Sequence, residues 1–364
     1  MYICHHLFKE GITIRILYLG WIGQKNVGDD LMFDNFVKLS KEIYGESCFI
    51  QGILPSEKHD YFNYYDLICL GGDSILLEGY INVLHRALLK GKKVIILGSG
   101  YDDLLDDSFI HRIETTKVPA YIYSDEIEEK LNNIANNAEF FGVRGPLTYK
   151  ILQKSNINMD KIIISGDSGF LLEPSSADSI PSNLKFSLKD KYIGVNFGTS
   201  FNNIYGKNES KILNDMIVVC KALINQGYKL YLYSMWHKDL DSLTKLYKCI
   251  NMKEKVKLDL NIRDAKVTAA ILKNCLFTIN LKLHANIISA VSNTPFICLG
   301  YRLKSHDLMQ SINCSDLIIT TDNKNLISNI MSKVTYITNN QSQIKQTLTS
   351  SITKYKSILK QSLH

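Results

Sequence analysis

Residues 275–301 read CLFTINLKLHANIISAVSNTPFICLGY, and this order of apolar and polar residues predicts a strand, a helix and a second strand. The first strand is expected over Cys275–Leu281, the helix over roughly Leu283–Ser292, and the second strand over Pro295–Gly300. Strands that alternate with helices are typical of parallel α/β units, in which ligands bind outside the carboxyl ends of the strands. The stretch therefore predicts a fold class and the sheet edge at which a site lies.

Lys282 and His284 stand where the first of these strands gives way to the helix. A helix N-terminus offers N–H groups and a positive dipole end to an anion. Lys282 would add a charge there and His284 a titratable proton, while Tyr301 and Lys304 follow the next strand and would lie near the same edge. The alternative is an ordinary surface lysine beside a histidine that caps the helix.

The same alternation of apolar runs and amphipathic stretches extends in both directions from this segment. It begins near Ile14, breaks at the proline- and serine-containing stretch Glu173–Asp190, and resumes at Tyr192. We therefore expect an α/β fold with two doubly wound, Rossmann-like domains that face each other across a cleft. The expected division is an N-terminal domain over 1–172, a linker over 173–190, a C-terminal domain over 191–338, and a final helix over 339–364 that packs back on the N-terminal domain.

Composition limits the class of protein. The chain has 364 residues, of which 45% are hydrophobic and 21% charged, as in ordinary globular proteins. The formal net charge of +6 comes from scattered lysines, so it does not require nucleic acid and fits an anionic small substrate or an anionic membrane surface. The eight cysteines form no CxxC pair and no metal-ligand spacing. We expect a cytoplasmic protein without a metal, and contact with the inner face of a membrane stays open.

The loop after the first expected strand is rich in glycine and ends in two carboxylates. Residues 20–30 read GWIGQKNVGDD, which lacks both the GK[ST] of a P-loop and the GxGxxG of a dinucleotide site. Asp29 and Asp30 would repel a phosphate at this helix start. They are interpreted either as helix-capping residues or as carboxylates that orient or deprotonate a hydroxyl group.

Three further loops follow expected strands of the first half. Gly72 and Asp73 belong to a paired-glycine turn that either is purely structural or allows close approach of a ligand. Arg144 stands at a strand-to-helix junction, where an arginine suits either a bidentate grip on phosphate or carboxylate, or a structural ion pair. Asp167 follows the last strand before the linker and either caps a turn or contacts the cleft.

Taken in order, these loops resemble the polysaccharide pyruvyl transferase family over about residues 14–312. The family's motifs read approximately G-x-x-N-x-G-D-E, a glycine turn, V-R-D, G-D-P, R-L-H-A and Tyr-x-x-Lys. The matching residues here are Asn26, Gly28 and Asp29 with Asp30 in place of Glu, Gly71-Gly72, Val143-Arg144, Gly166-Asp167, Lys282-Leu283-His284-Ala285, and Tyr301 with Lys304.

The resemblance implies a GT-B-like arrangement in which domain 1–172 binds the acceptor and domain 191–338 binds the donor. It also implies transfer of a pyruvyl group from phosphoenolpyruvate to a sugar of a surface polysaccharide or its precursor, as a pyruvate ketal. The expected partners are phosphoenolpyruvate as co-substrate and a glycan acceptor, with or without a lipid carrier. No cofactor, metal or nucleic acid is implied.

The resemblance also implies a role for each matching residue. His284 is expected to be the general acid, with Asp29 or Asp30 assisting on the acceptor side. Donor binding is expected from Arg144, Lys282, Leu283, Tyr301 and Lys304, and the acceptor-side loops are expected to contribute Asn26, Gly28, Gly72 and Asp73.

Lys282 departs from the family pattern, because lysine keeps the charge of the family's arginine and loses its planar fork. This leaves two alternatives open. One is a nucleotide-sugar glycosyltransferase of GT-B type, for which only the pair His306-Asp307 offers an acidic residue at the right place to bind a ribose. The other is a non-catalytic relative that serves in polysaccharide assembly.

Overall fold

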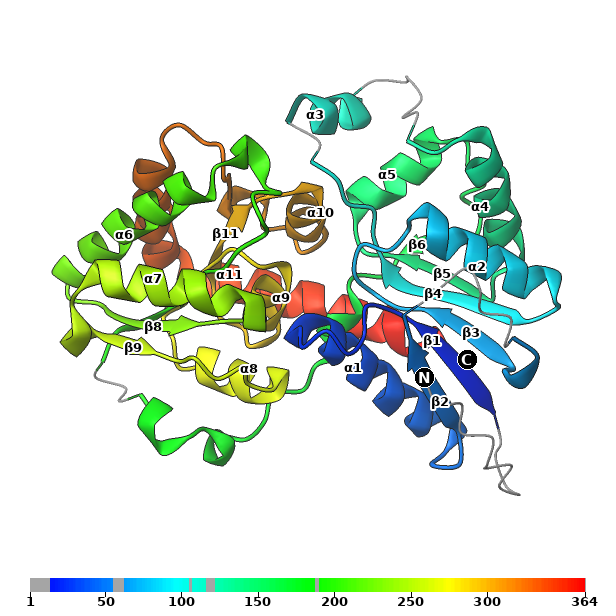
Figure 1. The fold of residues 1–364 in the computed structure, drawn as a ribbon, viewed down its shortest axis with the longest axis horizontal. Helices are drawn as coiled ribbons and strands as arrows, with labels where there is room; N and C mark the ends of the chain where they lie inside the picture. Colours follow the sequence, from blue (N-terminus) through cyan, green and yellow to red (C-terminus); the bar gives the residue numbers. More distant parts are fainter. Residues whose placement is uncertain (1–13, 55–61, 105–106, 116–121, 187–189, 364) are drawn as a thin grey trace.

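The computed structural model describes residues 14–54, 62–104, 107–115, 122–186 and 190–363, and it contains two parallel sheets with helices on their faces (Figure 1). The first sheet has six strands in the order β2-β1-β3-β4-β5-β6. Their bounds are Arg15–Leu19 (β1), Phe49–Ile53 (β2), Leu67–Leu70 (β3), Lys93–Ser99 (β4), Phe140–Val143 (β5) and Ile162–Ile164 (β6). The helices of this half are Val27–Tyr44 (α1), Glu78–Leu89 (α2), Asp107–Thr115 (α3), Asp125–Asn137 (α4) and Pro146–Lys154 (α5).

The second sheet also has six parallel strands, in the order β12-β11-β10-β7-β8-β9. Their bounds are Tyr192–Asn196 (β7), Lys229–Tyr233 (β8), Val256–Leu258 (β9), Phe277–Asn280 (β10), Phe296–Gly300 (β11) and Ile318–Thr320 (β12). The helices are Glu209–Asn225 (α6), Leu240–Ile250 (α7), Ala265–Leu272 (α8), Leu283–Val291 (α9), Leu303–Ser311 (α10) and Leu326–Lys360 (α11). The predicted fold class, with two doubly wound parallel sheets, is confirmed.

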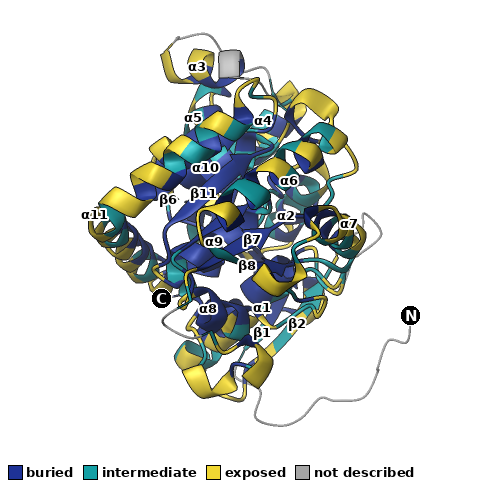
Figure 2. Ribbon diagram, turned by 90° about the vertical axis from the view of Figure 1, so that its left-hand side faces the viewer, coloured by how far each residue is buried: buried dark blue, intermediate teal, exposed yellow. Residues whose placement is uncertain are grey.

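The central strands are mostly apolar because helices cover both faces of each sheet. Every residue of β3 and of β11 is buried, and Figure 2 shows β7 and β11 as dark blue strands inside a shell of more exposed helices. In each sheet, the chain first adds strands on one side of the starting strand and then crosses over to add the rest on the other side. This switch point lies between β1 and β3 in the first sheet and between β7 and β10 in the second. Ligands of doubly wound sheets bind at such points.

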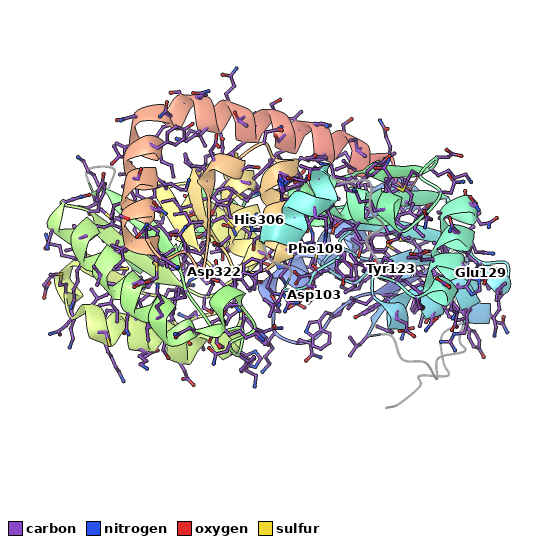
Figure 3. All side chains as sticks on the ribbon, turned by 90° about the horizontal axis from the view of Figure 1, so that it is seen from above. Asp103, Phe109, Tyr123, Glu129, His306 and Asp322 are labelled. Carbon is purple, nitrogen blue, oxygen red and sulfur yellow. The ribbon has the colours of Figure 1, made fainter. Side chains whose placement is uncertain are left out.

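Helix α11 joins the two halves and crosses the molecule in the view from above (Figure 3). It bends at Asn340, whose φ of −122° is not helical, and then continues to Lys360. Beyond the bend, the ring of Tyr355 stacks on Phe170 of the first half at 5.7 Å between centroids. The hydroxyl of Tyr44 in α1 donates to the carbonyl of Leu363 at 2.8 Å. The last helix thus begins earlier than expected from the sequence, and the domain boundaries themselves stay a prediction.

In the part of the chain that the structure describes, no helix combines the length and the apolar character needed to cross a membrane. The expected cytoplasmic location stays a prediction.

Asp307 of α10 caps a helix of the other half. Its carboxylate accepts hydrogen bonds from the backbone N–H groups of Leu147 at 2.8 Å and Thr148 at 3.2 Å, and from the Thr148 hydroxyl at 2.7 Å. These N–H groups belong to the first turn of α5, whose own N-cap residue is Gly145 and supplies no side-chain cap. A side chain from the second half therefore satisfies donors that α5 leaves unpaired.

Replacing this cap should weaken the junction between the halves. We expect Asp307→Ala to lower the free energy of unfolding by about 1–3 kcal/mol, because two buried N–H groups and a hydroxyl lose their acceptor. Urea unfolding measures the change, and Asp178→Ala, at an exposed aspartate in the segment between the sheets, is the matched control. Equal losses in the two variants would contradict the proposed importance of the cap.

Candidate active site

Loops at the carboxyl ends of the two sheets meet in the region between the sheets. The loop after β1 contacts the loop after β8: the backbone N–H of Val27 donates to the carbonyl of Met235 at 3.0 Å. The indole N–H of Trp236 donates to the carbonyl of Gln24 at 3.1 Å. The carboxyl ends of both sheets therefore face one another here, as expected from the sequence.

Four ionisable side chains from four loops or helix starts gather in this region. They are Asp29 in α1, Asp73 after β3, His284 in α9 and Lys304 in α10, and each interacts electrostatically with at least two of the others. Asp29 is 3% exposed and His284 is 7% exposed. Within the described residues, both carboxylate oxygens of Asp29, Oδ1 of Asp73 and Nε2 of His284 have no hydrogen-bond partner. Buried polar atoms without partners are rare in folded proteins and mark a place where a ligand can bind.

Gly28 brings the first loop against the catalytic candidate of the second half. A Cβ atom at Gly28 would lie 1.8 Å from Nδ1 of His284, so no other residue fits at this position without displacing the imidazole. The neighbouring Asn26 caps α1, since its side chain accepts from the N–H of Gly28 at 3.1 Å. These contacts explain why an asparagine and a glycine stand at positions 26 and 28 of the first loop.

The two carboxylates of the cluster have different ionisation behaviour. Burial raises the pKa of Asp29 well above its ordinary value, and the nearby negative charge of Asp73 raises it further. Burial also opposes the charge of Asp73, but Lys304, His284 and Arg144 outweigh it and lower the pKa of Asp73. Asp73 has a left-handed backbone with a φ of 68°. Two neighbouring carboxyl groups with opposite pKa shifts are typical of sites that transfer protons.

The two basic groups of the cluster also differ. Burial lowers the pKa of His284, although Asp167 and Asp73 act in the opposite direction, so the imidazole is held neutral in the absence of a ligand. Burial likewise opposes the charge of Lys304, but Tyr301, Asp73 and Asp102 outweigh it and raise its pKa. Lys304 is therefore the permanent cation of the cluster, and His284 is the group that can change its charge near neutral pH.

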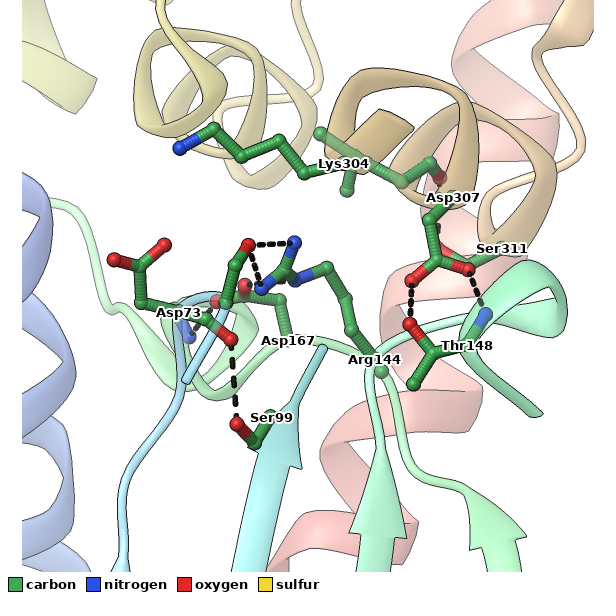
Figure 4. Close-up of polar contacts among 12 residues, drawn as sticks. Asp73, Ser99, Arg144, Thr148, Asp167, Lys304, Asp307 and Ser311 are labelled. Carbon is green, nitrogen blue, oxygen red and sulfur yellow. Dashed lines mark hydrogen bonds and ion pairs between the residues drawn. The ribbon is translucent and has the colours of Figure 1, made fainter. Parts of the chain in front are cut away.

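Arg144 lies below Lys304 and to one side of Asp73 (Figure 4), and it is completely buried. Its Nε donates to Asp167 at 3.2 Å, and its two terminal nitrogens donate to the Ser74 hydroxyl at 3.1 and 3.0 Å. Asp167 also accepts from the N–H of Gly169 at 2.8 Å, so it both caps a turn and pairs with the arginine. In Figure 4, Lys304 extends from α10 over the space above Asp73 and Arg144. Arg144 forms the floor of the site.

Lys282 lies in the wall of the site that belongs to the second half. Its ammonium group pairs with Asp239 at 3.1 Å, donates to the carbonyl of Thr199, and lies 5.4 Å from the centre of the Trp236 ring. Burial lowers the pKa of Lys282, and Asp239 opposes this shift. Direct donor contact by Lys282 or Arg144 stays a prediction, and their contacts within the chain favour a positioning role for both.

The remaining predicted site residues surround the cluster. Asp30 is half-buried; burial raises the pKa of its carboxyl, and the backbone N–H of Gly23 acts in the opposite direction. The side chain of Leu283 lies in the hydrophobic core, so only its backbone faces the loops. The Tyr301 ring is buried, 5.6 Å from the Lys304 ammonium. Gly72 packs closely against Met32 and Ser168.

The N-terminus of α9 provides a place for an anion. No side chain in the described part of the chain caps it, whereas Asn26 caps α1 and Asp307 caps α5. Uncapped N–H groups at the positive end of a helix bind phosphate and carboxylate groups. Among the described residues, no group of three or more His, Cys, Asp or Glu side chains is arranged to hold a metal ion.

Comparison with known proteins adds to this geometry. The family model described as polysaccharide pyruvyl transferase matches residues 26–302, which include every member of the cluster except Lys304. The chain belongs to the polysaccharide pyruvyl transferase family. Amylovoran biosynthesis protein AmsJ of Erwinia amylovora is 23% identical to this family member in an alignment 253 residues long, which covers 63% of this chain and 60% of AmsJ. The chain thus spans less than two thirds of that relative.

Solved structures show the fold of this pyruvyl transferase family member to be GT-B-like. S. aureus MnaA, solved with UDP, is 10% identical, with a TM-score of 0.62 and coverage of 94% of this chain and 92% of MnaA. Anabaena HepE, solved with UDP and glucose, is 11% identical, with a TM-score of 0.54 and coverage of 96% and 98%. At these identities the likeness concerns the fold alone.

Several residues of the site were not assigned from the sequence. Asp102 pairs with Arg302 at 2.7 Å and accepts from the backbone N–H of Lys304 at 3.1 Å, which joins the loop after β4 to α10. Asp239 holds Lys282, and Asp307 caps α5. The signal available for Asp102 was its place just after an expected strand end. Asp239 lies in a turn segment that no sequence pattern marks, and Asp307 was considered from the sequence only as an acidic residue for a ribose.

The contact between Gly28 and His284 can be tested by a double mutant. We expect Gly28→Ala to destabilise the protein by about 1–3 kcal/mol, because the new methyl group overlaps the imidazole. His284→Ala should remove most of this penalty, since the ring that causes the overlap is gone. Urea unfolding of both single variants and the double variant gives the coupling energy. Additive effects would show that the two residues do not touch.

The buried carboxyl of Asp29 should make stability depend on pH. Because its pKa in the folded state lies above the ordinary value of 3.8, its contribution to stability is present at pH values below 3.8 and is lost as the pH rises through the raised pKa. We expect Asp29→Asn to lack this loss and to be more stable at pH 7 by about 1 kcal/mol or more. Urea unfolding across pH measures this, with the exposed Asp241→Asn as control. Parallel curves for wild type and Asp29→Asn would contradict the expectation.

Proposed function

We propose that this chain transfers a pyruvyl group from phosphoenolpyruvate to a sugar of a surface polysaccharide or its precursor and forms a pyruvate ketal. The observation that carries the proposal is a cluster in which both carboxylate oxygens of Asp29, Oδ1 of Asp73 and Nε2 of His284 are buried without a hydrogen-bond partner, beside the cation Lys304. Membership of the polysaccharide pyruvyl transferase family and likeness to amylovoran biosynthesis protein AmsJ support the same reaction class.

The donor is assigned to the second half. Phosphoenolpyruvate carries a phosphate and a carboxylate, and both need N–H groups or cations. The uncapped N-terminus of α9 supplies N–H groups from Leu283 onward, and Lys304 supplies a positive charge that Asp102 holds at 3.7 Å. Arg144 and Lys282 act as positioning residues, because each already has a carboxylate partner. Lysine in place of the family's arginine at 282 is compatible with this role, since Asp239 and a backbone carbonyl require only a charge and N–H donors.

The proton movements then follow from the cluster. His284 forms the new C–H bond by giving its proton to the methylene carbon of the donor, which leaves an oxocarbenium-like centre at the neighbouring carbon. One sugar hydroxyl attacks that centre and gives its proton to the Asp29 carboxylate. The C–O bond between this carbon and the phosphate group then breaks, and the second sugar hydroxyl attacks the same carbon. The proton of this second hydroxyl leaves with the phosphate. One ketal and one inorganic phosphate result, and no redox change occurs.

The donor itself prepares His284 for this step. Without a ligand the imidazole is neutral, because burial lowers its pKa. A bound dianionic phosphate within a few ångströms favours the charged imidazolium and raises the pKa again. Protonation of His284 is therefore coupled to donor binding, which keeps the acid ready only when its substrate is present.

Ligand-dependent stability tests the donor assignment. A ligand that binds only the folded protein should stabilise it by about 2.7 kcal/mol at a hundredfold excess over its dissociation constant. We expect phosphoenolpyruvate to raise the unfolding midpoint of wild type and of His284→Gln, and to leave Lys304→Met unchanged. Lys324→Met, at an exposed lysine outside the cluster, is the matched control and should respond like wild type.

Two outcomes would contradict the proposal. Equal stabilisation of wild type and Lys304→Met would remove the donor site from the cluster. Stabilisation by a UDP-sugar and not by phosphoenolpyruvate would instead support a nucleotide-sugar transferase; the structurally similar MnaA and HepE were solved with UDP. Against that second function, the carboxylate of Asp307 already accepts three hydrogen bonds from α5 and is not available to bind a ribose.

A further inference from the structure

We propose that the rings of Phe201 and Trp236 form a corner against which a pyranose ring of the acceptor glycan packs. Phe201 lies in the loop after β7, and Trp236 lies in the loop after β8. The inference rests on the proposed function, because it takes the acceptor to be a sugar. It assigns part of acceptor binding to the second half, whereas the sequence resemblance assigned it to the first.

Phe201 presents an aromatic ring to solvent. Its side chain is 69% exposed, and among the described residues the next most exposed aromatic side chain is that of Tyr64, at 52%. Its backbone is left-handed, with a φ of 55°, and that of Asn202 is left-handed as well, at 58°. Asparagine tolerates this conformation, but for a bulky residue it is an outlier, and such outliers cluster at functional sites. Phe201 gains little from burial, so packing does not explain why an aromatic residue stands at this strained position.

The loop that carries Phe201 is held by a set of hydrogen bonds. Glu209, at the start of α6, accepts from the Thr199 hydroxyl at 2.7 Å and from the backbone N–H of Ser200. The N–H of Phe201 donates to the Thr199 hydroxyl at 3.0 Å, and the N–H of Glu209 donates to Asn202 at 3.0 Å. The exposed ring is therefore presented by an anchored loop, which lowers the conformational entropy lost on binding.

A continuous set of contacts joins this corner to the reaction site. The centres of the Phe201 and Trp236 rings are 6.1 Å apart and their planes are at 90°. The Lys282 ammonium lies 5.4 Å from the centre of the Trp236 ring and donates to the carbonyl of Thr199 in the Phe201 loop. Lys282 precedes His284 by two positions in the chain. The β7 loop also follows one of the two strands at the switch point of the second sheet, where ligands of this fold bind.

The chemistry of a sugar ring fits two aromatic walls. A pyranose has a face of C–H groups, which packs on an aromatic ring, and an edge of hydroxyl groups, which stays available for hydrogen bonds and for reaction. Two perpendicular rings contact one face and one side of such a ring, and they leave the remaining hydroxyls free. Phe201 offers no hydrogen-bonding group and the indole N–H of Trp236 is already donated to Gln24, so the corner selects for shape and C–H surface.

Saturation-transfer NMR with the intact protein and methyl β-D-galactopyranoside tests the corner. We expect transfer from the aromatic protons to the C–H protons of one sugar face, and a dissociation constant about tenfold weaker in Phe201→Gly, equal to about 1.4 kcal/mol. Phe201→Gly should keep wild-type stability within about 0.5 kcal/mol, since an exposed side chain is removed and glycine accepts a positive φ. Tyr336→Ala, at an exposed tyrosine of α11, is the matched aromatic control and should bind the sugar like wild type.

An unchanged dissociation constant in Phe201→Gly, or no transfer to the sugar in the wild type, would overturn the inference. Its failure is separate from failure of the proposed function, because the sugar titration contains no phosphoenolpyruvate. A protein that is stabilised by phosphoenolpyruvate and binds the galactoside equally well without Phe201 would keep the pyruvyl transfer and lose the corner. A protein that binds the galactoside through Phe201 and ignores phosphoenolpyruvate would keep the corner and lose the donor.

Discussion

Arg144 has no exposed surface, so its charge has to be balanced inside the chain, and much of the site takes its shape from how this is done. Asp167 and Ser74 supply the balance. Because Arg144 follows β5, Asp167 precedes the turn after β6, and Ser74 follows β3, one guanidinium group ties together three loops at the carboxyl edge of the first sheet. Asp73 is the neighbour of Ser74, so this carboxylate of the cluster is positioned by the same interaction.

The sequence was sufficient to predict the fold class and the edge at which the site lies. The spacing of apolar residues and the residue composition identified the strand, the helix and the second strand around His284 to within two residues at each end. The reason is physical: a parallel strand buried on both faces is a short apolar run, and the helix between two such strands has to begin at the loop that carries the ligand-binding groups. Lys304 was found for the same reason, since it follows β11.

Partners across the molecule were beyond the sequence. An aspartate that caps a helix 160 positions away, as Asp307 does for Leu147, has no local signature. The pairing of Lys282 with Asp239 likewise depends on how the loops after β7 and β8 fold over the start of α9. These tertiary contacts decide whether a cation is available to a ligand or already satisfied. Residue types were therefore easier to locate from the sequence than the roles they play.

The bend of α11 at Asn340 has a consequence for biosynthesis. The segment beyond it contributes Tyr355 and Leu363 to the packing of Phe170 and Tyr44 in the first half of the chain. A ribosome makes that first half early, at a rate of about 5–20 residues per second. Its strands can pair while synthesis continues, but the surface under α11 stays uncovered until residues 341–363 have been made. The N-terminal half of this protein thus completes its folding last, with an apolar face to protect in the meantime.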